Sequence, residues 1–507
     1  MAQHTLIDEK WREILPYIVA FLLGALYRAI PEALTPVYPV GFETIAYYAP
    51  GIIELEEKGA LTVFKHLTCG LTFYLLMYII IHLTGASMLF TILKITGSIL
   101  YGLLATSYMF FLRSGLNFDR ETSLAATLIC ISLPICLRIG WDRFVNMTGL
   151  IPMYLALGLL GRKEKSNKCW CTITLLLFLA VLSRELIASV VLAALSGYFM
   201  FTRMERKRLL PILMLCYSMF FVMTLPYLGF HLFPRDERLL VLPSPAKEAC
   251  PLPILINYFP EGFSFSLYIE LCKRVLMLFI CAYVLVMPFL IRGVFRSRLM
   301  DLMVIWLLLG GVINPLVLPF VSIPFFQRWQ TLLVFPFCAY LAKGLNELSA
   351  KIRPSNSRNL DIKLVIAVPY IMLGILYSSG LISWGIEWIP PNLMQSSIEV
   401  DQIDDCIICV KWLNNNAVSE ACLIVEERFR GWVLLYMKRE DVRILIVYES
   451  PCSEPGVGIP GAFERAYDTA IRAGFKTIYL IWYSGARIKR FNEVYRRGSI
   501  AVYQAVL

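Results

Sequence analysis

Long apolar runs separated by short charged loops are the feature that most constrains how this chain folds. Many runs are about 15–25 residues long, which matches the hydrocarbon core of a bilayer. Hydrophobic residues make up 58% of the 507 residues and charged residues 17%, whereas a soluble protein is about 25% charged. The strands of a membrane barrel would alternate polar and apolar residues, and these runs do not. The sequence therefore predicts a polytopic α-helical membrane protein.

Composition also excludes several classes of site and partner. The four histidines are too few and too scattered for a histidine-based metal centre; they are His4, His66, His82 and His231. Most of the 14 cysteines lie inside apolar runs, where a thiol packs as a small hydrophobic group. The net charge of +10 is distributed between the apolar runs rather than over a soluble face, so nucleic acid is not an expected partner.

The basic loops predict the topology, because short basic loops stay in the cytoplasm. Lys10 and Arg12 precede the first run, 14–30, and later basic clusters fall at 162–168, 203–208, 292–298 and 343–363. We expect about 11–13 transmembrane helices, a cytoplasmic N-terminus and a multi-pass protein of the cell membrane. The predicted division is a membrane domain, 1–384, and an extracytoplasmic domain, 385–507. The predicted outer loops of the membrane domain are 31–66, 138–146 and 231–266.

Two stretches need a special interpretation. The apolar stretch 169–200 has basic clusters at both ends, so it must cross the membrane an even number of times. We expect two short helices that meet at the polar tripeptide Ser183-Arg184-Glu185. The segment from the first run to the basic cluster at 162–168 should begin and end in the cytoplasm, which requires an even number of crossings. It contains five apolar runs: 14–30, 68–90, 97–112, 122–137 and 147–161. We therefore interpret 68–90 as a re-entrant or paired helix on the outer side.

Residues 385–507 have shorter apolar runs and more charged residues than the rest of the chain. Short apolar runs predict strands at Ala421–Val425, Val442–Tyr448 and Thr477–Trp482, and the segments between them predict helices at Asp404–Asn415, Phe429–Lys438 and Gly461–Ala473. This alternation favours a small α/β domain with a partly parallel sheet. Its loop Glu449–Pro460 follows a strand, at an edge where such folds often bind ligands. A zinc site at Cys406 and Cys409 is disfavoured by their helical pattern, and a disulfide from Cys422 or Cys452 stays open.

Acidic and basic side chains gather in the segments predicted to face outward. Each of these side chains could have a purely structural role, as a solvated carboxylate, a snorkelling arginine, an ion pair between helices or an interfacial anchor. Together they suit a reaction on a phosphate-linked substrate whose tail lies in the bilayer. An acid would deprotonate the acceptor or hold a metal, and arginines would stabilise charge on the phosphate. The residues are Glu43, Arg138, Asp142, Arg143, Asn146, Arg184, Glu185 and Arg328.

Short motifs over roughly residues 10–345 resemble those of GT-C glycosyltransferases, polytopic enzymes that use polyprenyl-phosphate-linked sugars. Gly41-Phe42-Glu43-Thr44 resembles a Gly-x-Asp-Thr motif with glutamate in place of aspartate. Arg138, Asp142, Arg143, Asn146 and Gly149 are similar to a second pattern of the class, and Arg184 stands at a polar helix tip where members often have histidine. Arg328, followed by Pro336 and Gly344, resembles a lipid-phosphate arginine. The layout is similar to that of archaeal oligosaccharyltransferases, although their Trp-Trp-Asp motif is not found in the tail.

The resemblance implies inverting transfer of a sugar from a polyprenyl (dolichyl) phosphate to a hydroxyl or amide of a glycan, lipid or protein. It implies that Glu43 is the base and Asp142 a helper acid. Arg138, Arg184 and Arg328 would bind the phosphate. A divalent cation, Mg²⁺ or Mn²⁺, held by Glu43 and Asp142 stays open, since the class includes both kinds of enzyme.

Two other functions compete with glycosyl transfer. A transporter or flippase of a lipid-linked or anionic substrate would place its charges near the bilayer midplane. A non-catalytic assembly subunit would leave the acids apart on a flat surface. The enzyme requires Glu43 and Asp142 to border one pocket at the outer face, together with Arg184 or Arg328.

Overall fold

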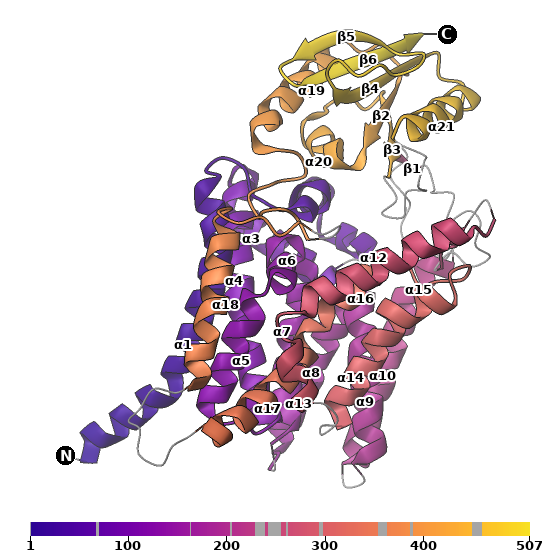
Figure 1. The fold of residues 1–507 in the computed structure, drawn as a ribbon. Coiled ribbons are helices and arrows are strands. Elements are labelled where there is room, and N and C mark those ends of the chain that lie inside the picture. Colours follow the sequence, from indigo (N-terminus) through magenta and orange to yellow (C-terminus); the bar gives the residue numbers. More distant parts are fainter. Residues whose placement is uncertain are drawn as a thin grey trace.

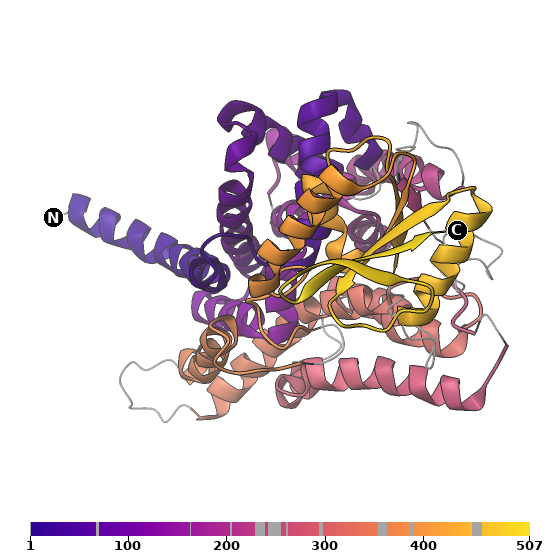
Figure 2. The ribbon, with the colours of Figure 1, turned by 90° about the horizontal axis from the view of Figure 1, so that it is seen from above.

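The computed structural model describes residues 2–66, 70–162, 164–202, 205–228, 239–241, 255–259, 262–293, 298–352, 362–385, 389–448 and 459–506. A bundle of helices makes up most of the chain, and a six-stranded sheet with its helices caps one end of the bundle (Figure 1). The N-terminal end of α1 (Ala2–Leu34) lies at the opposite end of the bundle. Seen from above, the α/β part covers the middle of this end while α1 projects to one side (Figure 2).

The first half of the bundle is built on α1 and α4, which pack along each other. Gly24 and Gly102 permit this approach, since a Cβ on Gly102 would lie 2.8 Å from the carbonyl oxygen of Phe21. After α1 the helices are α2 (Ala49–Lys58), α3 (Leu71–Thr84), α4 (Leu89–Phe110), α5 (Arg120–Ser132), α6 (Pro134–Asp142), α7 (Phe144–Leu160), α8 (Asn167–Ser183) and α9 (Glu185–Phe201).

The second half of the bundle ends with α18, which returns to lie beside α1 and α5 (Figure 1). Its helices are α10 (Arg206–Thr224), α12 (Phe265–Tyr283), α13 (Met287–Gly293), α14 (Arg298–Leu308), α15 (Asn314–Val317), α16 (Phe326–Leu332), α17 (Val334–Ile352) and α18 (Ile362–Ser378). Short 3₁₀ turns are Ala60–His66 (η2), Ala86–Met88, Leu225–Leu228 and Val400–Gln402, and π-helical turns are Thr44–Tyr48 (η1), Phe111–Gly115 and Leu309–Ile313.

Among the described residues, four helices are long and apolar enough to cross a membrane: Trp11–Leu34, Ala86–Gly115, Arg206–Thr224 and Leu299–Val317. The pair α5 and α6, bent by 70° at its break, makes up to five. Shorter apolar helices of 10–17 residues are α3, α7, α8, α9 and α18. The predicted multi-pass helical architecture is confirmed, and the count of about 11–13 spans stays a prediction.

Two helix breaks matter for the site. Pro134 lacks an N–H and disfavours helical geometry in Leu133, so α5 ends and α6 starts in a new direction. Arg184 is extended, with φ −167° and ψ 145°, and separates α8 from α9. The two short helices predicted to meet at Ser183-Arg184-Glu185 are therefore confirmed.

Other boundaries predicted from the sequence are wrong. The stretch 138–146 is not a loop, because α6 runs to Asp142 and α7 begins at Phe144. The helix expected at 97–112 begins at Leu89, directly after a break at Gly85, whose φ of +91° ends α3. The span expected around 267–291 is divided into α12 and α13. The predicted outer segment 31–66 contains the end of α1, η1, α2 and η2, and most of 231–266 lies outside the described residues.

The α/β part contains the predicted strands and helices and three strands that were not predicted. Its sheet has the order β1-β3-β2-β4-β6-β5, with β1 to β4 parallel and β5 and β6 antiparallel to their neighbours. The strands are β1 (Leu239–Val241), β2 (Cys422–Glu426), β3 (Arg443–Val447), β4 (Thr477–Tyr483), β5 (Asn492–Arg497) and β6 (Ile500–Val506), and the helices are α19 (Ile403–Asn416), α20 (Glu427–Tyr436) and α21 (Ile459–Arg472).

Strand β1 comes from the loop between α10 and α12, far from the rest of the sheet in sequence. Leu239 pairs with Ile444 and Val241 with Ile446, in parallel register. The division at 384/385 therefore leaves out one strand of the sheet. The loop Glu449–Pro460 lies mostly outside the described residues, as does Cys452.

The cysteines that the structure describes in the α/β part are buried free thiols. Burial raises the pKa of Cys409 and that of Cys422 to about 12, so both stay protonated. Cys406, in α19, is buried as well. Across the described part of the chain, no group of three or more His, Cys, Asp or Glu side chains is arranged to hold a metal ion.

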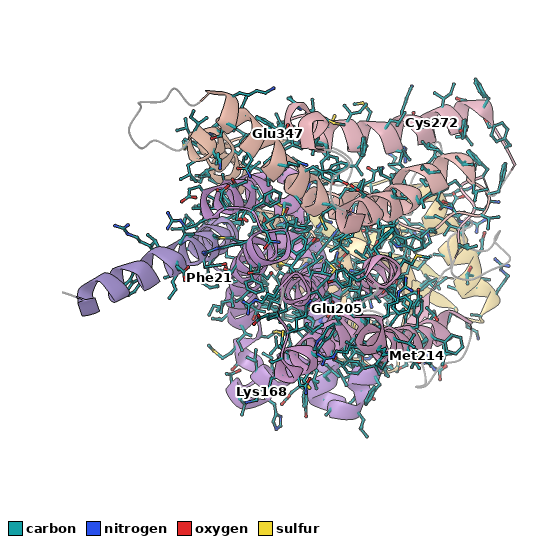
Figure 3. All side chains as sticks on the ribbon, turned by 90° about the horizontal axis from the view of Figure 1, so that it is seen from below. Phe21, Lys168, Glu205, Met214, Cys272 and Glu347 are labelled. Atoms are coloured by element: carbon teal, nitrogen blue, oxygen red, sulfur yellow. The ribbon has the colours of Figure 1, made fainter. Side chains whose placement is uncertain are left out.

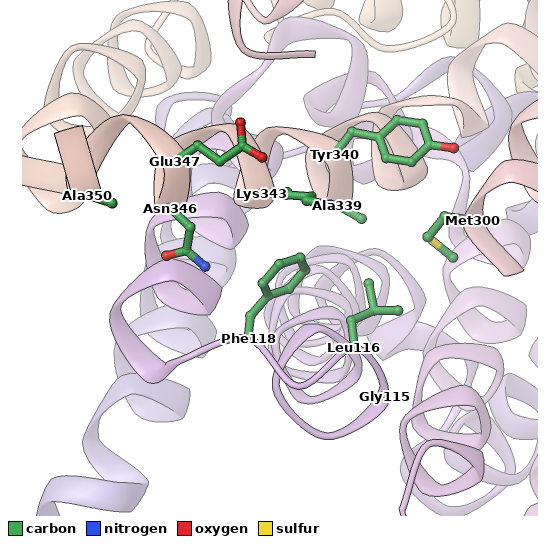
Figure 4. A pocket seen from close by; sticks show the side chains of 10 residues that line it. All are labelled: Gly115, Leu116, Phe118, Met300, Ala339, Tyr340, Lys343, Asn346, Glu347 and Ala350. Carbon is green, nitrogen blue, oxygen red and sulfur yellow. The ribbon is translucent and has the colours of Figure 1, made fainter. Parts of the chain in front are cut away.

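A cavity of about 640 Å³ lies between α17 and the turn before α5, lined by Phe118, Tyr340, Lys343 and Asn346 among others (Figure 4). It is at the end of the bundle where Arg113 pairs with Glu13 of α1, far from the α/β part. Figure 3 shows this end from below, with Lys168, Glu205 and Glu347 labelled. The cavity is thus at the end of the bundle away from the α/β part.

Candidate active site

Glu43 is positioned by the sharp turn that follows α1. Gly41 adopts φ +108°, and a Cβ there would lie 2.6 Å from the carbonyl oxygen of Trp141 and 2.8 Å from the Cβ of Asp142. Only glycine fits this close approach. The π-helical turn η1 begins at Thr44, directly after Glu43. The Glu43 residue is 8% exposed. The predicted acid is therefore held at a packed turn rather than in a solvated loop.

Three side chains from three elements surround the Glu43 carboxylate. Arg328 donates from Nη2 to Oε1 at 3.1 Å, and Tyr48 donates from its hydroxyl to Oε2 at 2.8 Å. Arg184 Nη1 lies 3.7 Å from Oε2. Burial, together with the Glu43 charge, raises the pKa of Tyr48 well above its ordinary value, so the phenol stays a donor.

Asp142 holds the backbone of Glu43 in place. Its Oδ2 accepts a hydrogen bond from the backbone N–H of Glu43 at 3.2 Å. The side chain is fully buried and forms an ion pair with Arg138, one turn earlier on α6. The Arg138 guanidinium also lies over the Trp141 ring, 4.8 Å from its centroid. Asp142 is therefore paired with an arginine, and both side chains are buried.

The tip between α8 and α9 brings Arg184 to the same place. Arg184 Nη1 donates to Oδ1 of Asn146 at 3.1 Å, and its Nε lies 3.9 Å from Oε1 of Glu185. Gly149 lets the tip approach α7, because a Cβ there would lie 2.9 Å from the Cβ of Ser183. The polar tip thus faces the acids instead of solvent.

Arg143 and Arg328 complete the cluster. Arg143 is 1% exposed and interacts electrostatically with Glu43 and Asp142. Its Nε and Nη1 make no hydrogen bond among the described residues. Arg328 lies in the first turn of α16, which follows Phe325 in the left-handed conformation at φ +60°. The Arg328 guanidinium lies 4.5 Å from the centroid of the Phe325 ring.

All eight residues selected from the sequence therefore meet in one cluster. Four arginines face the acids Glu43, Asp142 and Glu185, so the formal charge of the cluster is positive. A buried, positively charged cluster of guanidinium donors favours an anion with several oxygen acceptors, such as a phosphate.

The donor set fits a divalent cation poorly. Glu43 and Asp142 are joined through the Glu43 backbone N–H, and each carboxylate is already paired with an arginine. No third His, Cys, Asp or Glu side chain joins them in a metal-binding arrangement within the described ranges. Mg²⁺ and Mn²⁺ require several oxygen ligands.

The α/β part packs directly on the turn that carries Glu43. The Tyr47 hydroxyl donates to Glu427 of α20, and the Arg430 guanidinium lies 4.4 Å from the centroid of the Tyr47 ring. Gly431 comes so close to η1 that a Cβ there would lie 1.9 Å from the carbonyl oxygen of Ile45. Gly41 N–H donates to the carbonyl of Gln395 at 2.9 Å. The cluster is therefore at the end of the bundle that the α/β part caps.

Sequence reasoning missed several residues of this site. Tyr48 follows Glu43 by about one helical turn, but an aromatic residue in an apolar run carries no distinguishing signal. Arg28 and Glu32, which lie next to the site, did carry one, because an i, i+4 pair of opposite charges at the end of the first apolar run is unusual. The contacts from Glu427 and Gly431 depend on the tertiary fold.

Solved structures with a similar fold were found, whereas no protein-family model and no curated protein matches the sequence. The archaeal oligosaccharyltransferase AglB from Archaeoglobus fulgidus, solved with an inhibitory peptide and a dolichol-phosphate, is similar with TM-score 0.54 and 12% identity over 93% of this chain and 70% of that chain. ArnT from Cupriavidus metallidurans, bound to undecaprenyl phosphate, is similar with TM-score 0.52 and 12% identity over 96% and 98%. The chain therefore has the fold of these two proteins.

Proposed function

We propose that this protein transfers a sugar from a polyprenyl-phosphate-linked donor to an acceptor, at the end of the bundle capped by the α/β part. The observation that carries the proposal is the meeting of Glu43 with Asp142, Arg184 and Arg328 in one buried cluster. The two structural neighbours described above were solved with polyprenyl phosphates, which supports a donor of this chemical class.

The reaction that suits this cluster is a single displacement with inversion. The Glu43 carboxylate accepts the proton of an acceptor hydroxyl or amide, whose oxygen or nitrogen forms a bond to the anomeric carbon. The bond from that carbon to the phosphate oxygen breaks, and the polyprenyl phosphate leaves with the electron pair. Arg184, Arg328 and Arg143 stabilise the negative charge that develops on the phosphate.

Asp142 and Arg138 act on this reaction through Glu43. Asp142 fixes the Glu43 backbone by its hydrogen bond, and Arg138 compensates the Asp142 charge. The pair keeps the turn in place without competing for the acceptor proton. Glu185 and Asn146 hold Arg184 at the tip of α8 and α9.

The proposed orientation places the N-terminus in the cytoplasm and residues 385–507 outside. Short basic loops stay in the cytoplasm, and the helix ends that flank them, such as those of α9, α10, α17 and α18, lie away from the α/β part. The donor then enters from the membrane lipid, and a glycan, lipid or protein acceptor reaches the site beside the α/β part.

A transporter or an assembly subunit accounts less well for the site. The charges gather at one end of the bundle rather than along a path through its middle, since Tyr47, four residues after Glu43, contacts Glu427 of the α/β part. The two acidic residues are also buried and joined by the hydrogen bond from the Glu43 backbone N–H to Asp142, instead of lying apart on a flat surface. Both observations favour the enzyme.

The test is transfer from a labelled polyprenyl-phosphate sugar in membranes by wild type and Glu43→Gln. We expect Glu43→Gln to lose about 10²–10⁴-fold in turnover, the usual contribution of a general base. Glu54→Gln is the matched control, because Glu54 is an acid of the same outer segment that pairs with Lys58 and Lys65. Equal turnover by wild type and Glu43→Gln would remove Glu43 from the mechanism, and no transfer by wild type from any donor would favour the two other functions.

A further inference from the structure

A second charged cluster lies inside the bundle, separate from the proposed catalytic acids. Arg28 and Glu32, one turn apart on α1, form an ion pair at 2.6 Å and are 1% and 6% exposed. Lys94 of α4 joins them, with Nζ 3.8 Å from Glu32 Oε2. Charges inside a membrane-spanning helix are costly and are kept where they have a function. The contacts of Arg28 and Glu32 indicate their role.

Both members of the ion pair form a hydrogen bond with the backbone of Val40. Arg28 Nη2 donates to the Val40 carbonyl at 3.0 Å, and the Val40 N–H donates to Glu32 Oε2 at 3.2 Å. Val40 directly precedes Gly41, the residue at which the chain turns into Glu43. Lys94 further fixes the end of α1 by donating to the Glu32 carbonyl at 3.1 Å. The start of the turn is thus tied to the C-terminal end of α1.

A second line of contacts leads from Arg28 to the Glu43 carboxylate. The Arg28 guanidinium lies over the Phe144 ring, 5.5 Å from its centroid, and Phe144 stacks on Tyr48 at 5.6 Å between centroids. Tyr48 donates to Glu43 Oε2. Gly97 makes room for this stack, because a Cβ there would lie 2.8 Å from Phe144 Cζ.

We propose that Arg28 and Glu32 are positioning residues that hold the Glu43 carboxylate in its reacting geometry, through the Val40 backbone and through the Phe144–Tyr48 stack. This inference rests on the proposed glycosyl transfer. A displacement of about 1 Å in a catalytic group costs on the order of 10²-fold in rate. Removing one partner of a buried ion pair leaves the other charge unpaired, which moves the segment that the pair holds.

The kinetic test compares Glu32→Gln and Glu32→Ala with wild type in the transfer assay. Glu32→Ala removes the acceptor for the Val40 N–H, and we expect kcat to fall by about 10–100-fold while KM for the lipid donor changes little. Glu32→Gln keeps an oxygen acceptor at that place and is expected to retain more of kcat than Glu32→Ala. The control is Glu13→Gln, at the other end of α1, where Glu13 pairs with Arg113 at 3.3 Å and should not affect turnover.

A readout that does not depend on activity is amide hydrogen exchange of the peptide that contains Val40. We expect faster exchange in folded Glu32→Ala and nearly wild-type exchange in Glu32→Gln. If exchange is unchanged in both, or if it accelerates while kcat per folded molecule stays at the wild-type value, Arg28 and Glu32 only anchor α1 and the inference is overturned. Absence of transfer by wild type itself overturns the proposed function, and this inference with it.

Discussion

At the scale of single residues, Arg328 has the clearest separate role. It donates a hydrogen bond to Glu43 and comes from a different part of the chain, α16. Its guanidinium can bind both the base and a phosphate oxygen, because its donors form a planar fork. The side chain is 21% exposed, more than that of Arg184 at 9%. This exposure makes Arg328 the candidate to meet the donor first.

We expect Arg328→Ala to lower kcat/KM for the lipid-phosphate sugar by about 10²-fold, the usual loss of a charge-assisted donor at a developing charge. Arg328→Lys should recover only part of it, since an ammonium group lacks the fork geometry. The measurement is initial rate against donor concentration. Arg120→Ala serves as the control, because Arg120 pairs with its neighbour Glu121 elsewhere in the bundle. Wild-type kinetics in Arg328→Ala would exclude this residue from donor binding.

The eight site residues could be selected from the sequence because charges in segments that are otherwise apolar are conspicuous. What the sequence could not supply is how they are held. The extended conformation of Arg184 and the left-handed conformation of Phe325 depend on the packing of neighbouring helices. The full burial of Asp142 follows from the continuation of α6 through a stretch whose charges suggested a loop.

At the scale of elements, the contact between α20 and η1 joins the α/β part to the site. We expect Gly431→Ala to destabilise the fold by about 1–3 kcal/mol, the cost of overpacking, because the new Cβ would lie 1.9 Å from the carbonyl oxygen of Ile45. Turnover should fall as well, since η1 follows Glu43. Thermal unfolding and the transfer assay measure the two effects.

The control for Gly431→Ala is Gly385→Ala, where the nearest atom to a new Cβ is 3.6 Å away. A Gly431→Ala protein as stable and active as Gly385→Ala would show that α20 does not press on η1.

Periodicity and apolar length predicted the strands β2, β3 and β4 and the helices α19, α20 and α21 because these segments bury one face or both. The hairpin of β5 and β6 was missed because β5 is mostly exposed and rich in charged residues. Strand β1 was missed because three residues in a long loop give no periodicity, and its pairing with β3 is set by tertiary contact. The bundle break at 184 was predicted from the polar tripeptide that interrupts an apolar run, and the break at 85 falls in the stretch 68–90 that was expected to be irregular. The break at 133 was not predicted, because 122–137 is one apolar run in the sequence.

At the scale of the whole molecule, the separation of the two ends of the bundle makes the orientation testable. We expect a cysteine in place of Lys58, beside the α/β part, to react with a membrane-impermeant maleimide in intact cells. A cysteine in place of Glu347, at the opposite end, should react only after the membrane is opened. Mass spectrometry of the labelled peptides identifies each site. Labelling of position 347 but not of position 58 from outside would place the proposed active site in the cytoplasm.

The pairing of β1 with β3 has a consequence for biogenesis. The ribosome releases the segment 239–241 long before it synthesises 443–447. The earlier segment therefore stays unpaired until then, with its backbone N–H and C=O groups bound to water. The sheet closes only when the final portion of the polypeptide arrives. A truncated fragment that begins after the last membrane helix would lack that partner and expose the edge of β3, which invites self-association.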